Sequence, residues 1–422
     1  MTKILSFFLA VSVLIFPFQG WAITDAEEMS EAITENVFEA EIPDAPEVNA
    51  GDVGRYTSIA AGWSGSLHIS YFDRTNWDLK YAYYDPIDNV WSKGVIDSTL
   101  IKPAVEPVGL YTSIAVDART GNARIAYYDA YNKNLKFAKF VGGGGNCGQY
   151  LDWKCQTIVS SGDVGNYPSI VVDSTGLAHI SYFENATISP YGILQYAKER
   201  TDGTWELRAI DYSARVGWYT SIDVDSTNTP AISYYDITNG NLKYARKQGT
   251  GANCANGLWK CETVDSSLNN VGRYTSLEFD SNNVPHISYQ DGTYANLKYA
   301  KKVAGGCGAG AWTCMTLTSA GSVGYYTSMA ISSTNYVYVS FYDATLGDFR
   351  LQWTRPGSQV WYSDTMDFGG TVGGYSSFTL DSKGIRVASY YDYSNADLKF
   401  VKSTPFVGNC GNGNNWTCTK LD

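Results

Sequence analysis

The sequence predicts an all-β fold, a seven-bladed β-propeller of four-stranded antiparallel blades, because one motif recurs seven times in 422 residues. The first copy is Val53 to Ser58 (VGRYTS), and its glycine returns after 55, 56, 52, 55, 52 and 49 residues. A period of this size indicates one repeated supersecondary unit. Four short strand-like runs in each unit of about 50 residues are typical of a propeller blade.

The strands of each unit are predicted from runs of β-branched and aromatic residues bounded by turn formers. In the fourth copy these runs are Tyr219–Asp225, Ala231–Tyr235, Asn241–Lys247 and Trp259–Val264. The first run places Ile222 and Val224 on one side, and this period of two predicts a strand with one buried face. No extended helical periodicity follows Gly51.

Both ends of the repeat array contain whole units. A first strand begins at Tyr56, and a last fourth strand covers Trp416–Leu421. A solenoid would need polar capping units, and neither end copy resembles one. We therefore expect a closed ring in which no strand is borrowed from the other end of the chain.

The run Tyr-Thr-Ser-Ile-x-Val-Asp-Ser, followed by His-Ile-Ser-Tyr-Tyr-Asp and Asn-Leu-Lys-Tyr-Ala, resembles the repeats of secreted bacterial seven-bladed β-propeller proteins. Its first two strands are also similar to the layout of NHL repeats. The resemblance covers residues 53–422. It implies the fold and not an activity, because propellers serve as lectins, scaffolds, hydrolases and lyases.

Two further segments precede the repeats. Residues 4–18 are almost wholly apolar, follow Lys3 and end before Gly20-Trp21-Ala22, which predicts a signal peptide over residues 1–22; an uncleaved anchor is the alternative. Residues 23–52 contain ten acidic and no basic residues, as in a linker or a pro-segment. A secreted or periplasmic protein without a membrane span after cleavage is expected.

The eight cysteines form four local pairs, each with a tryptophan two residues before its second member. In an exported chain they predict disulfides. The expected bonds join Cys147 with Cys155, Cys254 with Cys261, Cys307 with Cys314, and Cys410 with Cys418. Zinc is the weaker alternative, since no histidine accompanies any pair.

The net charge of −11 comes mainly from the acidic segment. Residues 53–422 contain 30 basic and 32 acidic residues, so no basic surface for nucleic acid is expected. A glycan or an extracellular protein is the expected partner.

The Val-Gly-x-Tyr segments are the first candidates for a ligand site, because loops on a rigid frame often carry function. Seven tyrosines recur there and could stack on sugar rings or simply wedge between blades: Tyr56, Tyr111, Tyr167, Tyr219, Tyr274, Tyr326 and Tyr375. The preceding residue varies, and we expect it to face solvent. Its best binding candidates are of the types that dominate binding hot spots, namely Arg55, Trp218, Arg273 and Tyr325. Drifted surface residues are the alternative.

An acidic residue ends each second strand: Asp73, Asp129, Glu184, Asp236, Asp291, Asp343 and Asp392. We expect these side chains to bond the backbone of their own turns and to pair with nearby third-strand cations. Calcium at sets such as Asp73, Asn76 and Asp78 is an alternative, although an EF-hand spacing is missing. No other cofactor is predicted.

Catalysis is not indicated by any motif. His68, His179 and His286 share one repeat position that we expect to be half-exposed, and no nucleophile elbow or phosphate loop is present. The sequence therefore favours a non-catalytic protein that binds carbohydrate or protein on the Val-Gly-x-Tyr face. The alternatives are a glycoside hydrolase or polysaccharide lyase that uses paired carboxylates, and a structural protein of the cell surface.

Overall fold

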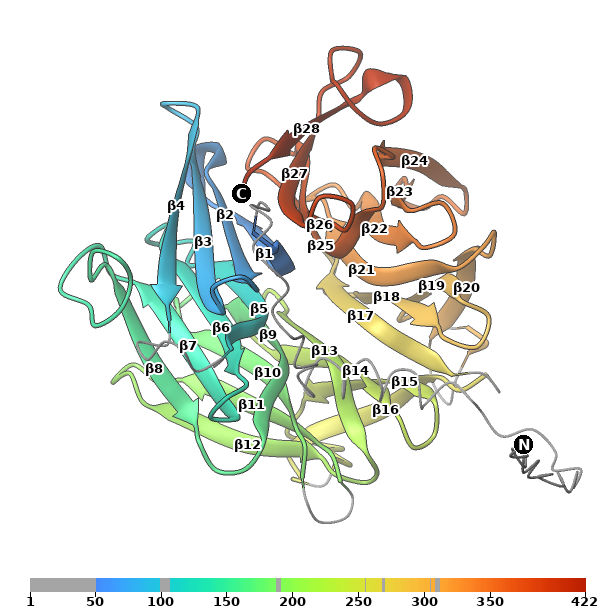
Figure 1. Cartoon of the computed structure of the whole chain (residues 1–422). Coiled ribbons are helices and arrows are strands. Elements are labelled where there is room, and N and C mark those ends of the chain that lie inside the picture. Colours follow the sequence, from blue (N-terminus) through green and yellow to red (C-terminus); the bar gives the residue numbers. More distant parts are fainter. Residues whose placement is uncertain are drawn as a thin grey trace, which may run out of the picture. The chain divides into compact units, whose positions relative to one another are not determined.

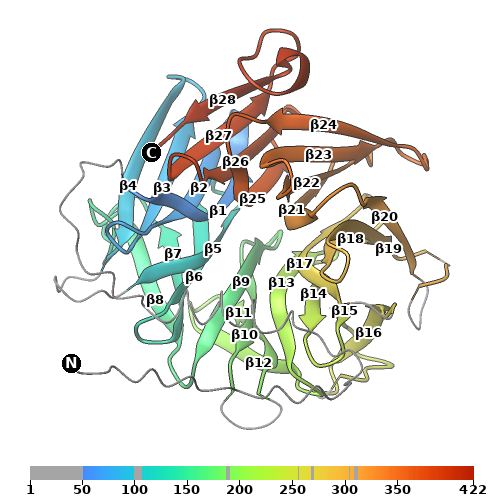
Figure 2. The same ribbon diagram turned by 45° about the vertical axis from the view of Figure 1, so that its right-hand side comes forward.

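A computed structural model confirms the seven-bladed propeller. The structure describes residues 51–98, 107–186, 191–254, 256–267, 270–303, 305–307 and 312–422. Seven four-stranded antiparallel sheets, here called blades 1 to 7 in chain order, surround a common axis with their first strands innermost (Figures 1 and 2). Each sheet keeps its sequence order, so neighbouring strands are joined by short connections.

The strands of blades 1 to 4 are β1 (Val53–Ala61), β2 (Leu67–Asp73), β3 (Asp78–Asp85) and β4 (Val90–Asp97); β5 (Val108–Val116), β6 (Ala123–Asp129), β7 (Asn134–Phe140) and β8 (Trp153–Val159); β9 (Val164–Val172), β10 (Ala178–Glu184), β11 (Ile193–Glu199) and β12 (Trp205–Asp211); β13 (Val216–Val224), β14 (Pro230–Asp236), β15 (Asn241–Lys247) and β16 (Trp259–Asp265). Those of blades 5 to 7 are β17 (Val271–Phe279), β18 (Pro285–Asp291), β19 (Asn296–Lys301) and β20 (Thr313–Thr318); β21 (Val323–Ile331), β22 (Val337–Asp343), β23 (Asp348–Thr354) and β24 (Trp361–Asp367); β25 (Val372–Leu380), β26 (Arg386–Asp392), β27 (Asp397–Ser403) and β28 (Trp416–Lys420). Two short 3₁₀ turns, η1 (Trp63–Gly65) and η2 (Asn412–Asn414), complete the described elements.

The serine of the repeated Thr-Ser pair joins each inner strand to the next. The backbone amide of Ile114 in blade 2 donates to Ser58 Oγ of blade 1 at 3.1 Å, and the same bond recurs at all seven junctions between blades. Because inner strands of different blades cannot share a ladder, this side chain satisfies an amide that would otherwise be buried without a partner. The invariant serine is therefore part of the scaffold.

The glycine of the motif lets neighbouring blades approach closely. Gly109 has φ +104°, and a Cβ there would lie 2.8 Å from the Cα of Leu79 on the third strand of blade 1. The inner strand is bulged at this point, with register shifts between Val108 and Leu110 and between Leu110 and Ser113. The bulge explains why the first strands begin three residues before the predicted tyrosine.

We expect Gly109→Ala to lower the free energy of unfolding by at least about 2 kcal/mol, because it adds both a strained φ and a backbone clash. Gly249→Ala is the matched control, since a Cβ there meets nothing within 4 Å. Urea unfolding of both variants checks the prediction. Equal stability of the two variants would contradict it.

The ring closes between blades 7 and 1, which lie side by side in both views (Figures 1 and 2). Asp422 of blade 7 accepts hydrogen bonds from Tyr71 (2.8 Å) and Lys80 of blade 1. Lys93 of blade 1 donates to the Leu421 carbonyl at 2.6 Å and lies 3.0 Å from Asp422 Oδ1. The closure uses no exchanged strand, as the sequence predicts.

All four predicted disulfides are present, and each closes the loop between the third and fourth strands of its blade. The bonds join Cys147 with Cys155 in blade 2, Cys254 with Cys261 in blade 4, Cys307 with Cys314 in blade 5, and Cys410 with Cys418 in blade 7. The described residues contain no free cysteine, so the zinc alternative has no thiolate to use.

The tryptophans that precede the second cysteines are buried in the contacts between blades. Trp153, for example, is 3 % exposed and meets the ring of Tyr81 of blade 1 edge-on at 4.9 Å. In the Trp-x-Cys pattern the tryptophan therefore packs against the neighbouring blade, and the cysteine closes the loop through its disulfide.

The predicted signal peptide (1–22) and most of the acidic segment (23–52) lie outside the described residues. Within the described part of the chain, no helix has the length and apolar character needed to cross a membrane.

Candidate functional site

The loops fall on two opposite faces of the propeller. The Val-Gly-x-Tyr segments pair with the ends of the second strands, as Val53 does with Asp73, so these segments and the second-to-third-strand loops share the Val-Gly-x-Tyr face. The first-to-second-strand and third-to-fourth-strand loops, with the disulfides, form the opposite face, here called the disulfide face. The sequence predicts ligand binding on the first of these faces.

The seven tyrosines form a closed ring around the axis, here called the tyrosine ring. Adjacent ring centroids lie 4.6–5.0 Å apart in tilted pairs, including the pair Tyr375 and Tyr56 that closes the circle. They line a cavity of about 190 Å³. Each tyrosine has φ between 49° and 53°, an uncommon conformation for a bulky residue. The mutual packing gives the ring a structural role in every blade; its role as a ligand site stays a prediction.

The variable residues before the tyrosines do not all face solvent. Trp218 and Arg273 are each only 7 % exposed, so the expectation of solvent exposure is wrong for them. Trp218 meets Phe183 of the preceding blade edge-on at 5.9 Å, and Arg55, half-buried, pairs with Asp52 at 3.0 Å and lies over Tyr391 of blade 7. Tyr325 packs near Tyr274, with ring centroids 5.8 Å apart. The side chains of Arg55, Trp218 and Tyr325 therefore contact a neighbouring blade, which sequence variation alone did not reveal.

Six of the seven acidic residues at the ends of the second strands bond their own turns, as predicted, whereas Glu184 accepts a hydrogen bond from Gln195 of the third strand. Asp73 Oδ1 accepts from the Asn76 amide at 3.0 Å and Oδ2 from the Asn76 side chain at 3.0 Å. Asp129, Asp236, Asp291, Asp343 and Asp392 make the corresponding contacts to their turns. No group of three or more potential metal-binding His, Cys, Asp or Glu side chains occurs in the described ranges. Calcium binding stays a prediction.

The third-strand lysines contact chiefly the preceding blade. Lys298 Nζ lies 2.5 Å from Asp265 at the end of the fourth strand of blade 4, and Tyr289 donates to the same carboxylate at 2.7 Å. Blades 1, 2, 4 and 7 repeat this tyrosine–aspartate–lysine arrangement. These cations stabilise the junctions between blades.

The three histidines are buried, at 4 %, 0 % and 2 % exposure, so the expectation of half-exposure is wrong. Each binds a third-strand tyrosine through Nδ1: His68 to Tyr81 (2.6 Å), His179 to Tyr196 (2.7 Å) and His286 to Tyr299 (2.5 Å). Packing against these tyrosine rings shields the histidines from solvent. His179 and His286 also contact Asp173 and Asp280.

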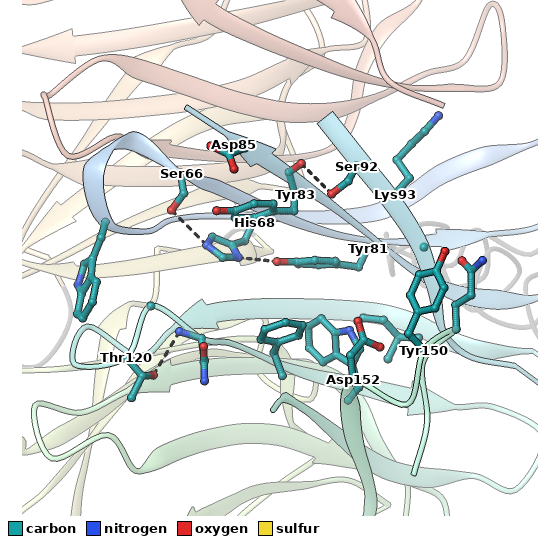
Figure 3. A pocket seen from close by; sticks show the side chains of 18 of the residues that line it. Ser66, His68, Tyr81, Tyr83, Asp85, Ser92, Lys93, Thr120, Tyr150 and Asp152 are labelled. Atoms are coloured by element: carbon teal, nitrogen blue, oxygen red, sulfur yellow. Dashed lines mark hydrogen bonds between the residues drawn. The ribbon is translucent and has the colours of Figure 1, made fainter. Parts of the chain in front are cut away.

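The disulfide face carries a cavity of about 670 Å³ between blades 1 and 2, here called the interblade pocket. Its volume is typical of small-molecule sites, which occupy about 300–1,000 Å³. Figure 3 shows His68, Tyr81 and Tyr83 on one side of it and Thr120, Tyr150 and Asp152 on the other. The remaining polar and aromatic lining includes Trp63, Ser66, Asp85, Ser92, Lys93, Asn122, Phe140, Gln149 and Trp153.

Blade 1 makes room for the pocket by departing from the repeat. In blade 3 an aspartate after the first strand, Asp173, faces Lys198 of the third strand at 3.9 Å, and blade 5 repeats the pair with Asp280 and Lys301 at 3.5 Å. Blade 1 has Gly62 and Tyr83 at these positions. A Cβ on Gly62 would lie 2.3 Å from Ser66 Oγ and 2.7 Å from His68 Nε2. Because Gly62 has no side chain, Ser66 Oγ lies beside His68 Nε2, where an aspartate carboxylate lies in blades 3 and 5.

The two walls are held firmly. Trp63 of η1 donates its indole N–H to the Ala118 carbonyl of blade 2 at 2.7 Å. On the other side, the loop that carries Tyr150 and Asp152 is closed by the Cys147–Cys155 disulfide. The Gly148 amide of this loop donates to the Ile96 carbonyl of blade 1 at 2.8 Å. The pocket is therefore built by two blades and is formed before any ligand arrives.

Burial lowers the pKa of His68 to about 4, so this imidazole is neutral at pH 7. Burial, and then the charge of Asp85, raises the pKa of Tyr83. Burial also raises the pKa of Tyr81, with a smaller contribution from Asp152. At neutral pH the pocket thus presents phenol hydroxyls and an uncharged histidine.

The repeat pattern as a whole does not indicate this pocket, but one position of the first copy does. Aligning the repeats shows that blade 1 alone places glycine where most copies have aspartate or serine, at Gly62. Blade 6 also departs, with Ser332 and Trp353, but there Tyr362 stacks on the tryptophan at 4.4 Å and covers it. Of the two copies that depart from the pattern at these positions, the first leaves a cavity on this face.

Comparison with known proteins shows similarity of fold alone. No family model and no curated protein matches the chain. Among solved structures, the polysaccharide lyase Uly1 aligns with a TM-score of 0.51 and 10 % identity over 93 % of this chain and 94 % of its own. AofleA from Arthrobotrys oligospora aligns at 0.48 with 11 % identity (74 % and 85 % covered), and the α-L-arabinanase of Penicillium chrysogenum at 0.46 with 13 % identity (71 % and 94 % covered).

Proposed function

We propose that this protein binds carbohydrate in the interblade pocket without cleaving it. The observation that carries the proposal is one preformed cavity that combines aromatic rings with hydroxyl, amide and carboxylate groups. Sugar rings present apolar faces that pack on aromatic side chains, and hydroxyls that need directed hydrogen bonds. Trp63 and Tyr150, at 53 % and 76 % exposure, offer such ring surfaces at the rim of the cavity.

The absence of cleavage is proposed from the role of His68. Its bond to Tyr81 recurs in blades 3 and 5, where the histidine is also held by an aspartate, so the pair belongs to the repeat and not to a specialised reaction. Its low pKa makes it a weak base at neutral pH. Asp85 accepts the Ile87 amide at 2.8 Å and so also holds its own turn.

Binding to a glycan array tests the proposal. We expect Trp63→Ala and Tyr150→Ala each to weaken binding of the best glycan at least about tenfold, as expected for loss of a hot-spot aromatic residue. Tyr294→Ala is the matched control, because this tyrosine is 64 % exposed in a loop of the Val-Gly-x-Tyr face. If only Tyr294→Ala weakens binding, the site lies on the other face, as the sequence analysis predicts.

Cleavage by paired carboxylates is the second candidate, since Asp85 and Asp152 line the same cavity. Two carboxyl groups flanking a glycosidic bond are the usual machinery of glycoside hydrolysis. Release of reducing ends or unsaturated products from the bound glycan, lost in Asp85→Asn or Asp152→Asn, would establish it. Binding without product supports the non-catalytic function.

We also propose that the protein is secreted or periplasmic. Four disulfides close loops on one face of the molecule, and such bonds persist in oxidising compartments. Recovery of the protein outside the cytoplasm, with residues 1–22 removed, would test both the location and the signal peptide.

A further inference from the structure

We propose that the interblade pocket selects amino sugars, glycans that carry a protonated amine, over glycans that carry carboxylates; this inference rests on the proposed carbohydrate-binding function. Two observations support it: carboxylates line the cavity on both sides, and the nearby cations are already paired with other groups.

The negative charges of the pocket lie on both of its sides. Asp85 ends the third strand of blade 1, and Asp152 belongs to the disulfide-closed loop of blade 2 (Figure 3). Each acts electrostatically on a phenol of the wall, Asp85 on Tyr83 and Asp152 on Tyr81. A ligand in the cavity therefore meets carboxylates from two blades.

The positive charges nearby are already paired. Lys93 is the one lysine or arginine among the described residues that line the cavity. Its ammonium group donates to the Leu421 carbonyl at 2.6 Å and lies 3.0 Å from Asp422. Arg119, in the same loop as Thr120, directs its guanidinium to Asp117 at 3.2 Å. A sugar carboxylate would thus meet two like charges without a matching cation, and such a juxtaposition strongly disfavours binding.

The aromatic rings favour the opposite charge. An ammonium group is attracted to the faces of tyrosine and tryptophan rings, and the attraction grows as the site excludes water. Tyr83, Tyr150 and Trp63 line the cavity together with the two aspartates. Carboxylates beside aromatic rings recognise a sugar amine, whereas an N-acetyl group would present an uncharged amide to the same surface.

Titration calorimetry with three pentasaccharides tests the inference: the glucosamine pentamer, its N-acetylated form and pentagalacturonate. We expect the glucosamine pentamer to bind at least tenfold more tightly than the N-acetylated form, and the galacturonate not to bind measurably. Asp85→Asn and Asp152→Asn should each reduce the glucosamine affinity about tenfold and leave the N-acetylated form within twofold. Asparagine keeps an oxygen that can accept the Ile87 amide, so the turn is retained.

Asp88→Asn is the matched control, since Asp88 lies in the same exposed turn as Asp85 and does not line the cavity. Tighter binding of the N-acetylated form or of the galacturonate would overturn the amine preference and leave carbohydrate binding intact. No binding of any of the three, together with an empty glycan array, would overturn the proposed function as well.

Discussion

Replacing Asp422 by alanine is expected to lower the free energy of unfolding by about 3 kcal/mol, because it leaves the Tyr71 hydroxyl without its acceptor and takes from Lys80 the nearer of its two carboxylates. Although burial alone would raise it, the donors Lys80, Tyr71 and Lys93 hold the pKa of Asp422 below its usual range. Blades 7 and 1 are not consecutive in the chain, so their junction depends on noncovalent contacts, among them these bonds and the Ile59–Ser377 bond. Guanidinium unfolding followed by tryptophan fluorescence measures the loss.

Asp97→Ala is the control for ring closure. Asp97 makes the same contacts between blades 1 and 2, with Tyr127 (2.6 Å) and Lys136, but the chain continues directly from blade 1 to blade 2. We expect the Asp97 variant to lose less stability and to resist proteolysis better than the Asp422 variant. Equal losses would show that the junction of blades 7 and 1 is no more sensitive than the junction of blades 1 and 2.

Stability is expected to fall as the pH rises from about 5 to 7.5, by about 3 kcal/mol, given a slope of up to about 1.4 kcal/mol per pH unit for one proton. Asp223 and Glu278 occupy matching positions on the adjacent inner strands β13 and β17, where the other blades have uncharged residues. Burial raises the pKa of Asp223 to about 7, and burial followed by the charge of Asp223 raises that of Glu278. The pair therefore retains a proton in the folded state that the unfolded chain loses, so the folded state is favoured at lower pH.

Glu278→Gln should flatten this fall and stabilise the protein at pH 8. Glu262→Gln provides a control of opposite sign: although burial opposes it, Lys302 holds the pKa of Glu262 below its usual range, so its loss should destabilise at neutral pH. Thermal unfolding of both variants from pH 5 to 8 decides. A pH profile of Glu278→Gln that matches the wild type would show that the pair does not govern stability.

The fold was predictable because its determinants repeat. The glycine represented by Gly109 recurs because the adjacent backbone leaves no room for a Cβ. The serine represented by Ser58 recurs because an inner-strand amide of the next blade needs an acceptor. Seven copies of such local requirements leave few architectures other than a closed ring. The disulfides were predictable for the same reason, since each one links two cysteines that are close in the sequence, as Cys254 and Cys261 are.

The interblade pocket was less predictable because it depends on what one copy lacks. Gly62 leaves space only in relation to Ser66, His68 and the neighbouring blade. Likewise, the repeat position of Trp218 varies between blades, which predicts a solvent-exposed side chain. In the structure, contact with Phe183 of another blade buries the Trp218 side chain. Such contacts between blades are set by three-dimensional neighbours that the repeat pattern does not name.

Hydrogen–deuterium exchange of the full chain, with and without its best array glycan, tests directly whether the interblade pocket is the ligand site. If the ligand occupies the interblade pocket, amides of residues 63–68 and 147–153 slow on binding while those of residues 54–57 and 217–220 are unchanged. Slowing confined to the Val-Gly-x-Tyr segments would place the ligand on the tyrosine ring and contradict the account.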